Sequence, residues 1–487
     1  MKRLLLFCLL LPAVTRAQTP SITFKAIAGK GKTVGVTAPV NGASYMASAK
    51  DYTLDENGAL TIPNTGAKPG LYSFYYQRMY MLYVRPGNQY SITMAEGDTS
   101  FAIAAKDQEG QTALCRLRFP FYQDIGTAWY KEDTVFADNL KRTVAEIGQQ
   151  LAPFAALLGQ HKIEKDFYDI VVRYIRNYYA TVLASTLLVP LTHTEFNSAS
   201  PAYDPARIKE LDKCWKEIRA IADVFDPASM TVSTYFEYHR IYDQLYLYYF
   251  LPRSKGTKRT DDFWTIGNYD LIHEYYREPL KEYLIATWIY AVCMENQFQP
   301  FVMDWYNEFN NRYPHSVYVQ PALVAAVDKV KQYREKTRGT FTDKQHLLEA
   351  TDTITSVAQL TARFKGKTVF MDMWATWCGP CKAEFVYNDS LRLFFRPRGV
   401  ELLYISLDDA KAEDRWKDMI KYYDLQGYHI RVSNDALFND IRKIFGTKKG
   451  GLAIPRYALI KDGKLVLENA KHPSDKEGLY KQLQAYL

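Results

Sequence analysis

Two cysteines near residue 380 have a spacing that suits thiol chemistry. The segment FMDMWATWCGPCKAEF, residues 370–385, places Cys378 and Cys381 three positions apart, with Gly379 and Pro380 between them. Such a pair could form a structural disulfide, contribute half of a metal site, or act as a redox-active dithiol. The surrounding sequence decides among these three.

The cysteine pair lies where an apolar strand meets a helix. The segment KTVFMDMWA, residues 367–375, is typical of a buried strand, and CKAEFVYNDSLRLFF, residues 381–395, is typical of a helix. Free N–H groups and the macrodipole at a helix N-terminus stabilise a thiolate, so we expect a lowered pKa at Cys378. Pro380 fits the first helical turn because it has no N–H to lose there. Cys381, one turn further in, is expected to be shielded.

This asymmetry predicts a two-step reaction. Cys378 attacks a substrate disulfide to form a mixed disulfide, and Cys381 then attacks Cys378 and releases the reduced substrate. Cys381 needs a base for this step. Asp372 precedes Cys378 by six residues in the apolar strand, and apolar surroundings raise a carboxyl pKa toward neutrality. The alternative is that Asp372 faces solvent from its strand.

Length and composition indicate a folded chain of several domains. The 487 residues exceed the roughly 250–300 residues at which single cores stop growing. Hydrophobic residues make up 47% and charged residues 24% of the chain, which excludes disordered and fibrous classes. The cysteines other than Cys378 and Cys381 are isolated from one another, so a disulfide scaffold is not expected.

The first residues have the pattern of an export signal. The start MKRLLLFCLLLPAVTRAQ has a basic beginning, an apolar stretch and a small residue at Ala17. We expect a signal peptide at residues 1–17, cleavage after Ala17, and a periplasmic protein. Cys8 lacks the small neighbours of a lipoprotein site, so lipid anchoring is the minor alternative. Contact with a membrane surface stays open.

Removal of the signal peptide makes the chain less basic. It takes away Lys2, Arg3 and Arg16 and no acidic residue, so the formal net charge falls from +7 to 7 − 3 = +4. This charge is small and evenly spread, and it does not indicate a nucleic-acid partner.

The pattern of apolar and turn residues divides the mature chain into three predicted domains. Residues 18–105 show short strands broken by turns, as in LYSFYYQRMYMLYV, and predict a small β-sandwich. Residues 106–338 show helical periodicity and predict an all-α domain. Residues 339–487 alternate strand and helix and include a hairpin with Asp-Gly at its turn, which predicts an α/β domain.

The predicted C-terminal domain resembles a known family. The segments VFMDMWATWCGPC and, about 70 residues later, GLAIPRYALIKDGKLV are similar to thioredoxins. They are more similar to the exported TlpA/ResA-type thiol-disulfide oxidoreductases. The resemblance covers roughly residues 340–487 and implies a thioredoxin fold.

The resemblance implies roles for the residues around the cysteines. Cys378 matches the attacking cysteine, Cys381 the resolving cysteine and Asp372 the buried acid. Glu384 matches an acidic residue found three places after the second cysteine in the TlpA-like branch. For Glu384, a role in proton transfer and a plain surface charge remain equally open.

The resemblance also implies a substrate-docking surface. Its residues flank the cysteines and the later proline: Trp377, Gly379, Pro380, Ile454 and Pro455. In the family this proline is cis and lies beside the cysteines. Arg456 stands where the family usually has threonine, and a cationic side chain beside the docking site would favour acidic partners.

Together these features predict an exported thiol-disulfide oxidoreductase that reduces disulfide-bearing client proteins. Reduction in an oxidising compartment needs an electron supply, which implies a membrane electron donor. The alternative is an envelope binding or scaffold protein whose helical domain recognises a ligand or partner, with an accessory redox domain. No cofactor is expected.

No metal site is predicted either. Zinc binding by the cysteine pair would need a second Cys or His pair at ligand spacing, and the chain shows none. Copper binding could add His429 or His472, but the Gly-Pro spacer suits disulfide exchange better.

Overall fold

The structure is a computed structural model of the 487-residue chain. It describes residues 20–95, 100–194, 205–255, 257, 259, 267–295, 298–349, 351–446 and 451–487. The predicted signal peptide, residues 1–17, lies outside the described residues. The chain separates into two compact units, Met1–Tyr290 with Tyr306–Val324 and Ala291–Trp305 with Ala325–Leu487. The division into three domains at residues 105 and 338 stays a prediction.

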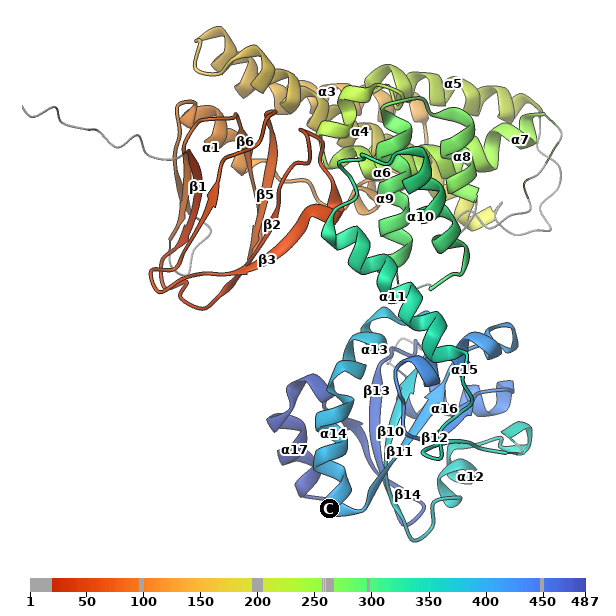
Figure 1. The fold of residues 1–487 in the computed structure, drawn as a ribbon. Helices are drawn as coiled ribbons and strands as arrows, with labels where there is room; N and C mark the ends of the chain where they lie inside the picture. Colours follow the sequence, from red (N-terminus) through yellow and green to blue (C-terminus); the bar gives the residue numbers. More distant parts are fainter. Residues whose placement is uncertain are drawn as a thin grey trace, which may run out of the picture. The chain divides into compact units, whose positions relative to one another are not determined.

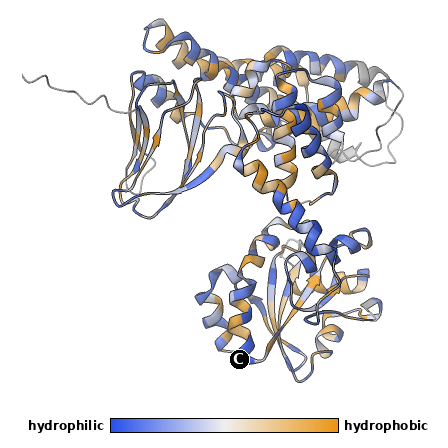
Figure 2. Ribbon diagram, viewed as in Figure 1, coloured by the Kyte–Doolittle hydropathy of each residue, from blue (hydrophilic) through white to orange (hydrophobic). Residues whose placement is uncertain are grey.

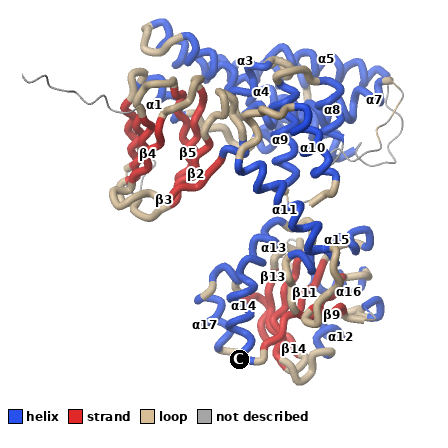
Figure 3. The backbone as a smooth tube through the Cα atoms, viewed as in Figure 1, coloured by secondary structure: helices blue, strands red, loops and turns tan. Residues whose placement is uncertain are grey.

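The first unit begins with two β-sheets (Figures 1 and 3). Their strands are β1 Ser21–Ala26, β2 Thr33–Thr37, β3 Ala49–Thr53, β4 Ala59–Pro63, β5 Gly70–Tyr76, β6 Arg78–Val84, β7 Tyr90–Met94 and β8 Phe101–Ala104. The strand orders are β4-β1-β7-β8 and β3-β2-β5-β6. Alternate residues of both sheets, such as Phe24 and Phe74, share one buried core, as in a sandwich. The predicted β-sandwich is confirmed.

Helices follow the sandwich, which confirms the predicted helical region (Figure 3). They are α1 Gln108–Arg116, α2 Tyr122–Glu132, α3 Phe136–Gly159, α4 Lys165–Thr194, α5 Pro205–Ile221, α6 Thr234–Tyr242, the π-helical η3 Asp243–Phe250, α7 Leu251–Ser254, α8 Asn268–Tyr275, α9 Leu280–Met294, α10 Phe301–Arg312 and α11 Pro321–Thr337. Among the described helices, none combines the length and the apolar character that crossing a membrane requires.

Buried tyrosines account for part of the core between these helices. The Tyr235 hydroxyl donates to the Val224 carbonyl oxygen at 2.7 Å, and the Tyr238 hydroxyl donates to the Ala222 carbonyl oxygen at 2.7 Å. Their rings are therefore packed as apolar groups while their hydroxyls keep hydrogen-bond partners.

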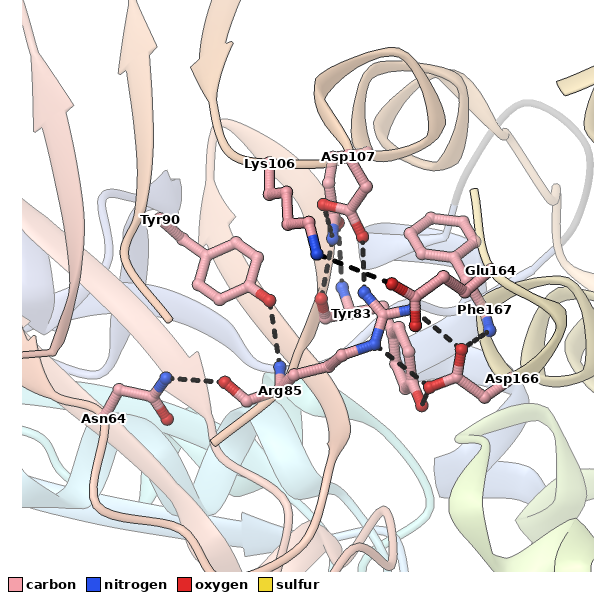
Figure 4. Close-up of polar contacts among 10 residues, drawn as sticks. Asn64, Tyr83, Arg85, Tyr90, Lys106, Asp107, Glu164, Asp166 and Phe167 are labelled. Atoms are coloured by element: carbon pink, nitrogen blue, oxygen red, sulfur yellow. Dashed lines mark hydrogen bonds and ion pairs between the residues drawn. The ribbon is translucent and has the colours of Figure 1, made fainter. Parts of the chain in front are cut away.

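An ion-pair network joins the sandwich to the helices within this unit (Figure 4). The Arg85 guanidinium, just after β6, lies 2.9 Å from Asp107 and 2.7 Å from Asp166, at the start of α4. The Tyr83 hydroxyl donates to Asp166 at 3.0 Å. Hydrogen bonding from Arg85, followed by that from Tyr83, lowers the pKa of Asp166 despite the opposing effect of desolvation. The sequence places these partners 81 residues apart.

The second unit contains a six-stranded sheet in the order β14-β13-β10-β11-β12-β9. The strands are β9 Gln345–Leu347, β10 Thr368–Trp374, β11 Val400–Ser406, β12 Gly427–Arg431, β13 Arg456–Lys461 and β14 Lys464–Ala470. The helices are α12 Val357–Ala362, α13 Gly379–Glu384, α14 Asn388–Phe395, α15 Glu413–Tyr422, α16 Asp435–Phe445 and α17 Glu477–Gln484. Strands β9 to β12 are parallel, and β13 and β14 are antiparallel to their neighbours. The predicted thioredoxin fold is confirmed.

The central strand β10 is buried on both faces, which explains its nearly continuous apolar sequence (Figure 2). Met371 and Met373 contribute to the core cluster on one face. On the other face, Phe370 packs against Phe395 of α14, with ring centroids 5.2 Å apart. Asp372 lies between Phe370 and Trp374 on this second face, since side chains alternate along a strand.

Candidate active site

The two cysteines lie at the start of α13, directly after β10. Cys378 is the N-cap residue, and it forms a disulfide with Cys381 across a Cα–Cα distance of 5.4 Å. The backbone N–H of Cys381 donates to Cys378 Sγ at 3.1 Å. Cys378 is 4% exposed and Cys381 is 1% exposed. Cys378 is thus the more exposed of these two recessed residues.

A distant loop completes the rim of this site. The Ile454–Pro455 peptide bond is cis, and the Ile454 carbonyl oxygen lies 3.8 Å from Cys378 Sγ. Gly379 and Pro380, between the two cysteines, are exposed. The side chain of Trp377 is also exposed, at 64%. The structure thus brings the residues expected for substrate docking to one place.

The loop before Cys378 is fixed by a buried polar network. Asp408 accepts hydrogen bonds from the Thr376 backbone at 2.9 Å and from the Thr376 hydroxyl at 2.7 Å. The Lys382 ammonium donates to the Thr376 carbonyl oxygen at 3.1 Å. Burial lowers the pKa of Lys382 to about 8. These contacts hold the strand-to-helix turn that presents the cysteines.

Asp372 is buried in β10, six residues before Cys378. It is 5% exposed and stands opposite Tyr404 of β11 and Tyr457 of β13 in the sheet register. Among the described residues, no hydrogen-bond partner reaches Asp372 Oδ1 or the hydroxyls of these two tyrosines. Burial, followed by the negative charge of Glu384, raises the pKa of Asp372 well above its usual range. The group is therefore held as a neutral acid over a wide pH range.

Glu384 is not a freely solvated surface charge. Its carboxylate accepts hydrogen bonds from the Ser474 backbone N–H at 2.9 Å and from the Ser474 hydroxyl at 2.8 Å. His472 Nδ1 lies 3.4 Å from Glu384 Oε1. Sequence reasoning missed Ser474 and considered His472 only as a metal ligand, because nothing in their spacing connects them to a helix 90 residues earlier.

The side chains around the site do not gather a metal-ligand set. Within the described ranges, no group of three or more His, Cys, Asp and Glu side chains could hold a metal ion. His429 is fully buried, with Nε2 at 2.8 Å from the Leu425 carbonyl oxygen and its ring stacked on Tyr404. His472 lies at Glu384 instead.

Arg456 is anchored beside the cis proline. Its guanidinium donates to Asn469 Oδ1 at 2.9 Å and to the Phe445 carbonyl oxygen at 2.9 Å. Arg456 also lines a small cavity of about 110 Å³ together with Pro455, Tyr457 and His472. The cation is thus placed next to the expected docking surface.

The described cysteines outside the site are expected to be unreactive. Cys115, Cys214 and Cys293 are free and buried. Burial raises the pKa of Cys115 and Cys293 to about 12 and that of Cys214 to about 11. Cys115 packs into the sandwich core.

We expect Asp372→Asn to stabilise the second unit, and to do so more strongly as the pH rises. The unfolded chain releases the Asp372 proton near pH 4, whereas the folded chain retains it to a higher pH. Stability of the wild type is therefore lost as the pH rises between these two values, by about 1.4 kcal/mol per pH unit. Denaturant unfolding of the oxidised protein at pH 4 and pH 7 measures the difference.

The matched control for this experiment is Asp414→Asn, at an exposed position of α15. An Asp372→Asn effect of equal size at pH 4 and pH 7 would contradict the burial of an ionisable proton at this position.

Comparison with known proteins supports the assignment of a thioredoxin fold to the second unit. Residues 330–483 match the family model described as Redoxin. Thiol-disulfide oxidoreductase ResA of a Bacillus cereus strain is 35% identical over 123 residues, which cover 25% of this chain and 63% of that protein. The ResA protein of Bacillus thuringiensis subsp. konkukian is 35% identical over 125 residues, 26% of this chain and 64% of that protein.

A solved structure also matches this part of the chain. It is a solution structure of a Bacteroides vulgatus protein described as a thiol-disulfide oxidoreductase, with 31% identity, coverage of 26% of this chain and 78% of that chain, and a TM-score of 0.22. The chain spans 63% of the length of the Bacillus cereus relative. The resemblance to the thioredoxin-like oxidoreductases is confirmed: the chain carries a Redoxin domain at residues 330–483, where it is similar to ResA-type thiol-disulfide oxidoreductases.

Proposed function

We propose that this protein is an exported thiol-disulfide oxidoreductase that reduces disulfides of client proteins through Cys378 and Cys381. One observation carries the proposal: the two cysteines form a disulfide at a helix N-terminus, with Ile454 next to Cys378 Sγ. A thiolate at this position is stabilised by the helix. The activity of the related Bacillus proteins, by their names, is of the same kind.

The reaction proceeds through a mixed disulfide. The Cys378 thiolate attacks one sulfur of the client disulfide, and the other client sulfur leaves as a thiolate and takes up a proton. Cys381 then loses its proton and attacks Cys378 Sγ, which releases the second client sulfur as a thiolate. The client gains two electrons and two protons, and the enzyme becomes the disulfide form seen in the structure.

Buried carboxyl groups serve the second step. The Cys381 thiol is 1% exposed and cannot deliver its proton directly to bulk water. Asp372 accepts this proton after it has passed its own proton to Glu384, which is the outer acceptor. A carboxyl whose pKa is raised toward the working pH is suited to such a transfer.

The docking surface surrounds the outer sulfur. An extended client segment lies against Ile454 and Pro455, with Trp377, Gly379 and Pro380 on the opposite side. Arg456 adds an anchored cation at the edge of this surface, so clients with an acidic residue near their disulfide are favoured.

The cellular setting follows from the sequence pattern at residues 1–17. The protein acts in the periplasm after removal of the signal peptide. Since that compartment is oxidising, the disulfide formed in each cycle is reduced again by a membrane electron donor. The partners of the protein are therefore this donor and the client proteins.

The equilibrium reduction potential of the cysteine pair tests the direction of the reaction. We expect a value of about −250 mV or lower, as in thioredoxin-type reductases. The mature protein is titrated with glutathione or dithiothreitol buffers, and the reduced thiols are counted after alkylation. The double variant Cys378→Ser, Cys381→Ser is the control, and it should show no reversible redox couple.

A value between about −120 and −180 mV would contradict a reductase and indicate an oxidase or isomerase. Absence of a reversible couple would overturn the redox proposal altogether. It would favour the alternative of an envelope binding or scaffold protein whose helical domain recognises a ligand or partner.

A further inference from the structure

We propose that His472 and Ser474 are positioning residues that hold Glu384 as the outer proton acceptor for the resolving step at Cys381. This inference rests on the proposed function, because it concerns a proton that moves only when the cysteines exchange disulfides. It adds the segment after β14 to the site. The sequence patterns alone predict only the loop that carries the two cysteines and the loop that carries Pro455.

The first observation is that both oxygens of Glu384 are engaged from one short segment. Ser474 donates its backbone N–H to Oε2 at 2.9 Å and its hydroxyl to Oε1 at 2.8 Å. His472 Nδ1 lies 3.4 Å from Oε1. Two hydrogen bonds to different oxygens fix the orientation of a carboxylate.

The second observation is that the negative charge of Glu384 affects the pKa of buried groups in the site. Its negative charge contributes to the raised pKa of Asp372, and also to that of Tyr457, after the larger effects of burial and Asp372. The Tyr457 ring also contacts His472 edge-on, with centroids 5.4 Å apart. Glu384 therefore acts electrostatically on the buried acid and contacts the surface imidazole.

The third observation is that the side chain of His472, which contacts Glu384, is exposed to solvent. The side chain of His472 is 52% exposed, whereas that of Glu384 is 14% exposed. His472 lines the cavity of about 110 Å³ beside Pro455. A cavity of this size holds several water molecules, since one needs roughly 10–15 Å³ of such volume. A proton received by Glu384 has an exit through His472 and this cavity.

The proposed route of the proton runs from Cys381 through Asp372 to Glu384. Asp372 passes its proton to the Glu384 carboxylate, and the ionised Asp372 then takes the proton of the Cys381 thiol. The Cys381 thiolate forms a bond to Cys378 Sγ, and the bond from Cys378 to the client sulfur breaks. The client leaves as a thiolate with the bonding electron pair and is protonated by water, while Glu384 returns its proton to solvent.

The other charged side chains near this segment do not compete for Glu384. Lys471 and Asp475 pair with each other at 2.8 Å. The sheet contributes Asp372 and Tyr457, which are already part of the route. Lys476, two residues after Ser474, lies over the Tyr387 ring, 5.5 Å from its centroid.

The inference is tested with Ser474→Ala and His472→Gln in the full chain. The oxidised protein reacts with excess dithiothreitol, and tryptophan fluorescence follows opening of the disulfide from pH 5 to pH 9. In this direction Cys381 leaves as a thiolate and must be protonated, so the same proton route is used in reverse. We expect each variant to react at least about tenfold more slowly and to shift the midpoint of the pH–rate profile.

Two matched controls keep the chemistry of the substitutions the same. Ser390→Ala removes a hydroxyl on α14 that bonds the Tyr387 carbonyl oxygen at 2.8 Å. His346→Gln removes an exposed histidine on β9. Both should retain the wild-type rate and pH profile. Ser474→Thr keeps a hydroxyl and should restore most of the rate lost in Ser474→Ala.

The outcomes separate this inference from the proposed function. If the wild type reacts and both variants keep its pH profile, the positioning role is wrong and the oxidoreductase proposal stands. If Ser474→Ala and Ser474→Thr slow the reaction equally without moving the pH midpoint, Ser474 has only a structural role, which also overturns the inference. If the wild-type disulfide does not react with dithiothreitol, the proposed function itself fails.

Discussion

Replacing Cys381 by serine should abolish turnover and leave the protein covalently attached to its client through Cys378. The serine hydroxyl cannot displace the client from Cys378 Sγ, so the reaction stops at the mixed disulfide. The recessed geometry supports this expectation, because Cys381, at 1% exposure, is the group placed to reach Cys378 from inside. The adduct should contain one client per chain.

Electrophoresis without reducing agent measures this adduct. The reduced Cys381→Ser variant is mixed with an unfolded disulfide-bearing protein, alkylated, and separated; the adduct band should disappear after dithiothreitol treatment. Cys378→Ser is the matched control and should form no adduct, because Cys381 is shielded from large substrates. Equal adduct formation by both variants would contradict the assignment of Cys378 as the attacking residue.

Replacing Arg85 by methionine should destabilise the first unit by about 3 kcal/mol. The Arg85 side chain is 17% exposed and the Asp107 side chain is 8% exposed, so removal of the cation leaves a buried carboxylate without its partner. Asp166 moderates the effect because its side chain is 46% exposed and can be hydrated. Since the network joins the sandwich to α1 and α4 (Figure 4), the loss should also lower the cooperativity of unfolding.

Denaturant unfolding followed by far-ultraviolet circular dichroism measures this change. Lys141→Met is the matched control, since it breaks an exposed ion pair with Asp138, and exposed pairs contribute little to stability. Adding Asp107→Asn to Arg85→Met should recover part of the stability. An Arg85→Met effect no larger than that of Lys141→Met would show that the network contributes little.

The immediate surroundings of the cysteines could be predicted because they depend on local signals. The strand over residues 368–374, the helix that begins after Cys378, and the hairpin turn at Asp462 and Gly463 all follow from short-range patterns. Both turn residues have positive φ values, 51° and 72°, as a tight Asp-Gly hairpin requires.

Other local features could not be predicted from short-range sequence patterns. The turn between β5 and β6 lies at Gln77, with φ of 61°, inside a run that contains no glycine, proline or asparagine. The helix expected over residues 381–395 is divided into α13 and α14 by a 3-10 turn, Phe385–Tyr387. At this turn Phe385 packs against Trp374, with ring centroids 5.3 Å apart. A tertiary contact of this kind is not visible in helical periodicity.

The two carboxyl groups of the site also differ in how far their surroundings could be predicted from the sequence. Burial of Asp372 in an apolar strand could be expected from its neighbours in the sequence. The partners of Glu384 could not, because Ser474 and His472 come from a segment about 90 residues away. The residues that orient a functional group in this domain thus depend on sheet topology, which brings the end of β14 next to α13.

The burial of Cys115, Cys214 and Cys293 has a practical consequence for work in living cells. Alkylating reagents attack thiolates, and these three thiols are buried and stay protonated at neutral pH. A brief pulse of reagent on native cells should therefore label the reduced Cys378, whose thiolate is stabilised at the helix N-terminus, and spare the others. The ratio of labelled to unlabelled mature protein would report the fraction of the pair that is reduced in the cell, without any substitution in the chain.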